Sequence, residues 1–281
     1  MSAVSEQTEI LLPWPAQALG ALLDVPLPNV ADGEGLPLLW HWVYLLDRPA
    51  QADLGLDGHP VRGTVPAPPG PGLRRMWAGG RVRASGTLRC GEPATRRSRV
   101  LSAEDKQGRS GPLTFVTVHH QVLQRGSVIV DERQDVVYRA AAGQRAAATA
   151  AGPLVPPGEG ERPIDVSPTL LFRFSALTYN AHRIHYDRGY ARDVEGYPGL
   201  VVHGPLQALA MAEAARAAGC PGSAGARDLT FDYRLLSPLF DHQGMVVSAA
   251  REPDAISTAV RDSYGRQTAS GTLTREGTAP W

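Results

Sequence analysis

The pattern of apolar and polar positions divides the chain into two halves that resemble each other. In the second half, residues 204–218 repeat small and apolar positions at helical spacing, and Gly219 stands where a helix would stop. The side chains that this predicted helix places on broadly one side are Leu206, Leu209, Ala210 and Ala217. Strand-like runs follow at 229–236, 245–250, 256–264 and 268–274, with Tyr264-Gly265-Arg266 as the turn between the last two.

The first half shows the same order of elements. A helical candidate at 38–46 comes first, and Gln124-Arg125-Gly126 forms a turn between the last two strands. The strand-like runs of this half lie at 81–88, 97–102, 113–123 and 127–138. A helix followed by antiparallel strands, given twice, predicts two α+β units from an internal duplication, whose sheets join side by side.

A stretch at 140–162 separates the two halves. It is rich in Ala, Pro and Gly, has no usable hydrophobic period and carries several turn residues. We therefore expect an N-terminal unit at 1–140, a linker at 141–162 and a C-terminal unit at 163–281.

Composition and charge narrow the classes of function. Of the 281 residues 43% are hydrophobic, which suffices for a core, and the formal net charge of zero offers no footprint for nucleic acid or an anionic membrane. No run approaches the roughly 18 apolar residues of a membrane span. Cys90 and Cys220 are too far apart for a metal-ligand pair and form no disulfide framework. Because Glu6, Glu9 and several prolines also argue against a signal peptide, we expect a cytoplasmic protein.

Most of the candidate chemistry lies between residues 177 and 204. Three of the eight histidines, His182, His185 and His203, stand here, directly before the predicted helix. Imidazole exchanges protons near neutral pH, and a helix start offers free backbone N–H groups to a developing oxyanion. The segment therefore predicts an acid/base site.

The spacing in this segment resembles the signature of the MaoC-like hotdog enoyl-thioester hydratases and dehydratases. That signature runs Gly-Asp-x-Asn-Pro-aliphatic-His, then five residues, then Ala. Residues 179–185 occupy the motif, the next five residues lead to Ala191, and residues 199–204 resemble the lead-in to the family's central helix. The identities depart at four motif positions, where Tyr179, Asn180, His182 and Arg183 stand.

These departures, together with three runs of the first half, are similar to a narrower branch of double-hotdog enzymes. This branch includes mesaconyl-C4-CoA hydratase, itaconyl-CoA hydratase and the fungal mitochondrial 3-hydroxyacyl-thioester dehydratase. The three runs are Trp40-His41-Trp42, Gly55-Leu56-Asp57-Gly58-His59-Pro60 and Arg74-Arg75-Met76-Trp77-Ala78-Gly79-Gly80. The resemblance covers almost the whole chain. It implies an α+β double hotdog, two antiparallel sheets each wrapped around a central helix, with the active motif in the second half and the first half as scaffold and tunnel wall.

The resemblance also implies a hydro-lyase that reversibly hydrates a 2-enoyl thioester, such as a mesaconyl-CoA or itaconyl-CoA type ester, without a metal or other cofactor. His185 takes the position of the catalytic histidine, and the N–H of Gly204 is the candidate donor to the thioester carbonyl. Asn180 stands at the aspartate position, where an amide can orient water but cannot accept a proton. Either His185 shuttles the proton alone, or His182 or Asp187 supplies the second group.

Several residues are candidates for substrate binding. His182 is one, and His203 is either a helix cap or a substrate contact. Arg183, Arg74 and Arg75 are rival partners for a substrate carboxylate, and the alternative is that they bind CoA phosphates or form ion pairs. The acyl carrier, CoA or carrier protein, stays open. The choice between a monomer and a homodimer also stays open, because a double hotdog closes its own pseudo-dimer.

Other functions compete for the same residues. His182, His185, Asp187 and His203 could in principle hold a metal, but the hydratase motif explains them without one. A hotdog thioesterase or a non-catalytic thioester-binding protein is the alternative class, and the missing aspartate is the feature that favours it. The remaining histidines are assigned to structure; these are His41, His59, His119, His120 and His242.

Overall fold

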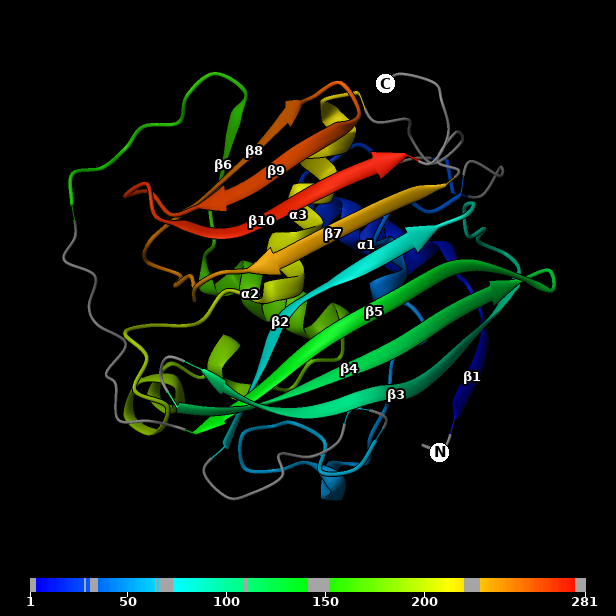
Figure 1. Ribbon diagram of the computed structural model, residues 1–281, viewed down its shortest axis with the longest axis horizontal. Coiled ribbons are helices and arrows are strands. Elements are labelled where there is room, and N and C mark those ends of the chain that lie inside the picture. Colours follow the sequence, from blue (N-terminus) through cyan, green and yellow to red (C-terminus); the bar gives the residue numbers. More distant parts are fainter. Residues whose placement is uncertain are drawn as a thin grey trace.

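The fold is one continuous antiparallel sheet that wraps around a single long helix (Figure 1). The computed structural model describes residues 4–27, 29–30, 35–63, 65, 73–108, 111–140, 152–219 and 228–275. Residues 141–151 of the expected linker and Cys220 lie outside these ranges. Within the described ranges ten strands follow the order β1-β3-β4-β5-β2-β7-β10-β9-β8-β6.

The two halves contribute five strands each, in mirrored order. The first half supplies β1 (Ser5–Ile10), β2 (Leu73–Ala84), β3 (Pro93–Gly108), β4 (Gly111–Gln124) and β5 (Ser127–Ala140). The second supplies β6 (Glu161–Ile164), β7 (Leu229–Leu235), β8 (Met245–Arg251), β9 (Ala255–Arg261) and β10 (Gln267–Arg275). This arrangement confirms the predicted α+β double hotdog and joins its two expected sheets into one.

The halves meet where β2 pairs with β7, and two glycines permit this seam. Gly79 has φ +154° beside a bulge in β2, and a Cβ on Gly80 would lie 2.4 Å from the Arg133 carbonyl oxygen. Trp77 precedes them and donates its indole N–H to the Tyr233 hydroxyl of β7 at 3.0 Å. The glycines therefore let three strand backbones approach closely at the centre of the molecule.

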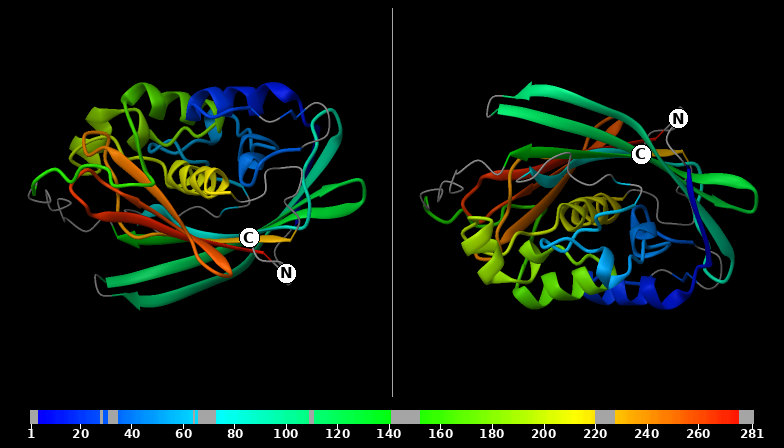
Figure 2. Two further views of the ribbon diagram at one scale, coloured as in Figure 1. Left: turned by 90° about the horizontal axis from the view of Figure 1, so that it is seen from above. Right: turned by 90° about the horizontal axis from the view of Figure 1, so that it is seen from below.

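The long helix α3 (Gly204–Ala217) confirms the helix predicted at 204–218, but its burial differs from the prediction. It lies between the sheet and a layer formed by α1 (Pro13–Leu23) and α2 (Pro168–Leu177) (Figure 2). Because both sides of α3 are covered, residues from 206 to 213 are buried without a break, whereas Ala217 is exposed. The expected one-sided apolar face was wrong for this reason.

Among the described residues of the first half there is no central α-helix, so the predicted helix at 38–46 was wrong. Only a 3-10 turn, Trp40–Val43, forms there, between Leu39 with φ 69° and Leu45 with φ 52°. The aromatic side chains instead reach polar partners: the Trp40 indole N–H donates to Glu213 of α3 at 2.8 Å. The helix of this half is α1, which begins with Pro13, a residue that a first helical turn accepts because its N–H needs no partner there.

Seven of the eight predicted strand runs overlap an observed strand over most of their length, and the eighth is displaced along the chain. The run expected at 81–88 belongs to β2, which begins at Leu73 and ends at Ala84. Its first residues combine two arginines with two glycines, a poor strand pattern, yet β5 and β7 pair with β2 on either side. Tertiary pairing outweighs local propensity here. Among the described residues, no helix has the length and apolar character that crossing a bilayer requires.

Candidate active site

A cavity of about 860 Å³ lies between the two halves, next to the N-terminus of α3. The second half lines it with Asn180, His182, His185 and Gly204, four of the predicted site residues. The first half contributes residues of β2, including Arg75 and Trp77, and a loop that carries His59. The cavity is therefore built by both halves together.

His185 lies at the buried end of the motif and presents one free ring nitrogen. Its Nδ1 contacts the Val201 carbonyl oxygen at 2.7 Å, and since a carbonyl only accepts, Nδ1 carries the proton and Nε2 keeps its lone pair. Burial lowers the pKa of His185 to about 4, although the bond to Val201 acts in the opposite direction. The imidazole is therefore neutral at pH 7 and able to accept a proton.

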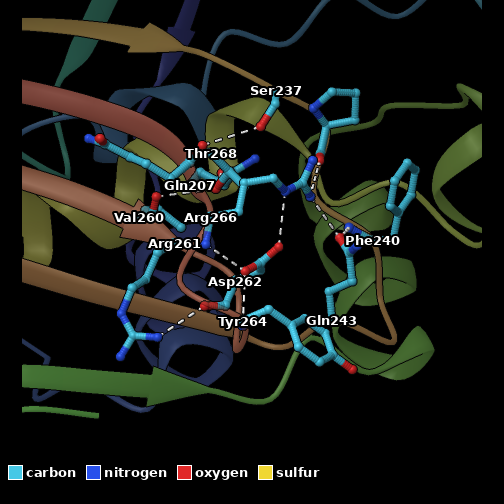
Figure 3. Close-up of polar contacts among 12 residues, drawn as sticks. Gln207, Ser237, Phe240, Gln243, Val260, Arg261, Asp262, Tyr264, Arg266 and Thr268 are labelled. Carbon is cyan, nitrogen blue, oxygen red and sulfur yellow. Dashed lines mark hydrogen bonds and ion pairs between the residues drawn. The ribbon is translucent and has the colours of Figure 1, made fainter. Parts of the chain in front are cut away.

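A polar network in the second half holds the loop that pairs with the segment around Val201 (Figure 3). Val201 forms a β-bridge with Phe240, whose N–H is bound by the side chain of Gln243 at 3.2 Å. Arg266 donates to Gln243 and to the buried carboxylate of Asp262, at 3.0 Å each. This network fixes the 236–243 loop against the segment that orients the His185 ring.

His203 lies behind His185 rather than in the cavity. It occupies the N-cap position of α3 but makes no side-chain cap; its Nε2 instead contacts the Ser175 hydroxyl at 2.8 Å. Its ring is fully buried and stacks on that of His185, with centroids 3.7 Å apart and an interplanar angle of 19°. The geometry therefore fits neither predicted role, cap nor substrate contact, and gives His203 a supporting position.

Gly204 brings the start of α3 to the cavity wall. A Cβ at this position would lie 2.2 Å from Leu235 Cδ1, so any other residue here would displace the Leu235 side chain of β7. No side chain caps α3. The helix N-terminus therefore directs its dipole and its first backbone N–H groups to this side of the site.

Asn180 is held by its own loop and faces the cavity. Its Oδ1 accepts the backbone N–H of His182 at 3.0 Å, in a turn that follows α2. This bond leaves the amide N–H groups as the part of the side chain available to a ligand. Burial lowers the pKa of the neighbouring His182, so that this ring is also neutral at pH 7.

The structure separates the three candidate arginines. Arg183 pairs with Asp187 at 2.8 Å, lies over the Tyr190 ring and does not line the cavity. Arg74 also lies outside it, with its Nε 2.6 Å from a carboxylate oxygen of Glu195. Only Arg75 lines the cavity. Because Asp187 is held in the ion pair with Arg183, it is not positioned as a second acid/base group.

His59 is the site residue that the sequence analysis missed. Its ring lies 3.9 Å from that of His182, which is 5.3 Å from that of His185, so the centroids of His59, His182, His185 and His203 form a row. The signal in the sequence was the Asp57-Gly58-His59 run, an acid and an imidazole two residues apart. Spacing alone did not indicate that this loop reaches the second half.

Asp57, His59 and His182 place one ligand atom each within 4.8 Å of one another, which is a distance compatible with a metal ion. Their arrangement fits an ion poorly, because Asp57 Oδ2 already accepts from His59 Nδ1 at 2.9 Å. The rings of His59 and His182 are inclined by only 36° at 3.9 Å, an overlap that does not direct two lone pairs to one point. Asp57 and His59 therefore form a hydrogen-bonded pair of a carboxylate and an imidazole.

A double-hotdog sheet with a neutral, buried histidine and a helix start at its central cavity defines a MaoC-like thioester hydro-lyase. The model of the hydroxyacyl-thioester dehydratase type 2 family matches residues 39–241, and the chain belongs to this family.

Known proteins agree with this assignment. The chain is 43% identical over 262 residues to mesaconyl-C(4)-CoA hydratase of Chloroflexus aurantiacus, covering 92% of this chain and 91% of that protein. A mitochondrial hydroxyacyl-thioester dehydratase type 2 of Schizosaccharomyces pombe is 43% identical over 77 residues, 27% of this chain and 25% of that protein. A MaoC-like dehydratase from Phytophthora capsici shares the fold, with a TM-score of 0.70 at 14% identity, over 99% of this chain and 96% of that one.

Proposed function

We propose that this protein reversibly adds water to a 2-enoyl thioester, with His185 as the proton shuttle. The observation that carries the proposal is the free Nε2 of a neutral His185 at the cavity that the start of α3 also lines. Base and oxyanion donor thus lie on the same cavity, as the reaction requires.

In the hydration direction, water attacks C3 of the enoyl group while Nε2 of His185 takes one of its protons. The electrons of the C2–C3 double bond move toward the thioester oxygen, where the N–H of Gly204 stabilises the negative charge with the dipole of α3. The imidazolium then returns the proton to C2. Asn180 orients water or substrate through its amide group. Dehydration follows the same path in reverse.

The proposed substrate is a CoA ester whose acyl group carries a carboxylate, as the name of the Chloroflexus aurantiacus relative suggests. Arg48, Arg62 and Arg139 line the same cavity and suit the phosphates of CoA. Inside the cavity Arg75 lies over the Tyr138 ring at 5.7 Å and can meet a carboxylate of the acyl chain.

The direct test of the function is a panel of thioesters with crotonyl, mesaconyl and itaconyl groups on CoA and on an acyl carrier protein. A hydratase removes the absorbance of the conjugated enoyl group without releasing thiol. Release of free thiol would instead identify a thioesterase. Binding without either change would identify a non-catalytic thioester-binding protein.

Replacing Arg75 by methionine is expected to lower kcat/KM for a carboxylated enoyl-CoA by about 10 to 100-fold. A hydrogen bond to a charged group contributes about 1.5–3 kcal/mol, and methionine keeps most of the side-chain volume. Crotonyl-CoA, which has no second carboxylate, should change by less than about threefold, since a factor of that size is under 1 kcal/mol. The measurement is the ratio of the two kcat/KM values, with Arg97→Met, which removes an exposed ion pair with Glu6, as the control. An equal loss for both substrates would contradict the specificity role of Arg75.

Changing Asn180 to aspartate is expected to keep measurable turnover and to move the acid limb of the pH profile to higher pH. Aspartate can accept the same His182 N–H, while its negative charge stabilises the protonated form of nearby imidazoles and so raises their pKa. The base is then lost at a higher pH than in the wild type. A complete collapse of activity at every pH would show instead that the amide is required for its shape or its N–H donors.

A further inference from the structure

The loop of residues 55–60, from the first half of the chain, is built closely onto the catalytic motif of the second half. Gly58 has φ +89°, and a Cβ there would lie 1.8 Å from the Ala181 carbonyl oxygen. The Asp57 carbonyl accepts the backbone N–H of Arg183 at 2.9 Å, and the Leu56 carbonyl accepts from its guanidinium at 3.1 Å. The loop is therefore a fixed part of the site.

Within this loop Asp57 orients His59. Asp57 Oδ1 accepts the backbone N–H of His59 at 3.0 Å, and Oδ2 contacts Nδ1 of its ring at 2.9 Å. Because an ionised carboxylate only accepts, Nδ1 carries the proton and Nε2 keeps its lone pair. His59 and His185 both line the cavity.

Electrostatics keep this pair in the form needed for accepting hydrogen bonds. Burial lowers the pKa of His59 and the charge of Arg75 acts in the same direction, while Asp57 and Glu195 partly offset both. Burial tends to raise the pKa of Asp57, but the bonds and charge of His59 outweigh it and leave that pKa lowered. At pH 7 the pair is thus a carboxylate beside a neutral imidazole.

We propose that His59, oriented by Asp57, is the second catalytic residue of the site and replaces the carboxylate that Asn180 does not provide. This inference rests on the proposed hydratase function. Nε2 of His59 accepts a hydrogen bond from the second O–H of the water whose first proton passes to His185 and on to C2. That second proton stays on the oxygen and becomes the hydroxyl of the product. Asp57 is a positioning residue, which fixes the His59 tautomer and strengthens Nε2 as an acceptor.

The pair has a counterpart outside the site. His119 and Asp131, on neighbouring strands β4 and β5, also form an imidazole–carboxylate contact at 2.9 Å, through Nε2 of His119, and His119 does not line the cavity. This pair supplies a matched control, because its loss removes the same chemical interaction without touching the reaction.

The test measures kcat and KM of four proteins, namely wild type, His59→Ala, Asp57→Asn and His119→Ala, with the best enoyl-CoA of the panel. We expect kcat of His59→Ala to fall by about 10 to 100-fold with KM within about threefold, since the loss of one hydrogen bond to the reacting water has an effect of about that size. Imidazole in solution should restore part of the loss. Asp57→Asn keeps size and shape, but an amide N–H can bind Nδ1 and place the proton on Nε2. We therefore expect a similar loss of kcat, without rescue by imidazole. His119→Ala should keep the wild-type values.

Three results would overturn the inference while the wild type remains an active hydratase. These are kcat of His59→Ala within about threefold of wild type, a loss that lies in KM alone, or loss of wild-type turnover after dialysis against a chelator, which would assign the three residues to an ion. A wild type that hydrates no thioester of the panel would overturn the proposed function itself. Circular dichroism and thermal unfolding of Asp57→Asn separate a loss of kcat from a loss of fold.

Discussion

Replacing His185 by alanine is expected to lower kcat by about 10² to 10⁴-fold while KM changes by less than about threefold. The ring supplies the base Nε2, and no other ring in the row is held by the Val201 carbonyl in the same position. Substrate binding depends on other parts of the cavity, so the loss should fall on turnover. Retention of near-normal turnover by this variant would remove His185 from the mechanism.

The pH dependence of the wild type checks the same assignment. Because burial lowers the pKa of His185 to about 4, its Nε2 is free above that pH and protonated below it. We therefore expect kcat/KM to stay level from neutral pH downward and to fall only as the pH approaches about 4. His119→Ala, which leaves the cavity unchanged, should show the wild-type profile.

Replacing Glu132 by alanine is expected to lower the free energy of unfolding by about 3–5 kcal/mol. Glu132 of β5 is buried; one of its carboxylate oxygens lies 3.0 Å from His41 Nε2, and both accept the Trp42 indole N–H at 3.1 Å. Burial alone would raise the pKa of Glu132, but these contacts outweigh it and hold that pKa below its usual range. Its removal leaves the buried imidazole of His41 and the half-buried indole N–H of Trp42 without their acceptor.

Urea unfolding of the wild type and of Glu132→Ala measures this loss, with Arg192→Ala as the control. Arg192 forms an exposed pair with Asp193, and such pairs contribute about 0–1 kcal/mol. The free energy of unfolding of Glu132→Gln should lie between those of Glu132→Ala and the control, since the amide oxygen still accepts one bond. A cost for Glu132→Ala no larger than that of the control would show that the first half is not held together by this network.

The strand pattern was predictable because it depends on neighbours in the sequence. The hairpin of β4 and β5, for example, turns at Arg125-Gly126, and the period of two in β4 reflects one buried face and one half-buried face. The same approach gave the wrong structure for residues 38–46. Its aromatic residues suit several structures, and the turn at Trp40–Val43 is selected by partners far away, Glu132 and Glu213.

The site shows the same division. His185 and Gly204 were found from the spacing of a motif, since both belong to the segment that leads into α3. Arg183, Arg74 and Arg75 were equivalent candidates in the sequence, because side-chain direction along an irregular loop or a bulged strand is not encoded by type. In the folded chain Arg183 pairs with Asp187 and Arg74 with Glu195, whereas Arg75 lines the cavity.

The sequence by itself determined the family, the duplicated strand pattern and the motif that contains His185, because each depends on residues close together in the chain. The tertiary structure decided which residues face the cavity, that residues 38–46 form no α-helix, and that Asp57 and His59 meet the motif from more than 100 positions away. The physical reason is packing: contacts between distant segments are set by the shape and burial of the folded chain, and no local pattern carries that information.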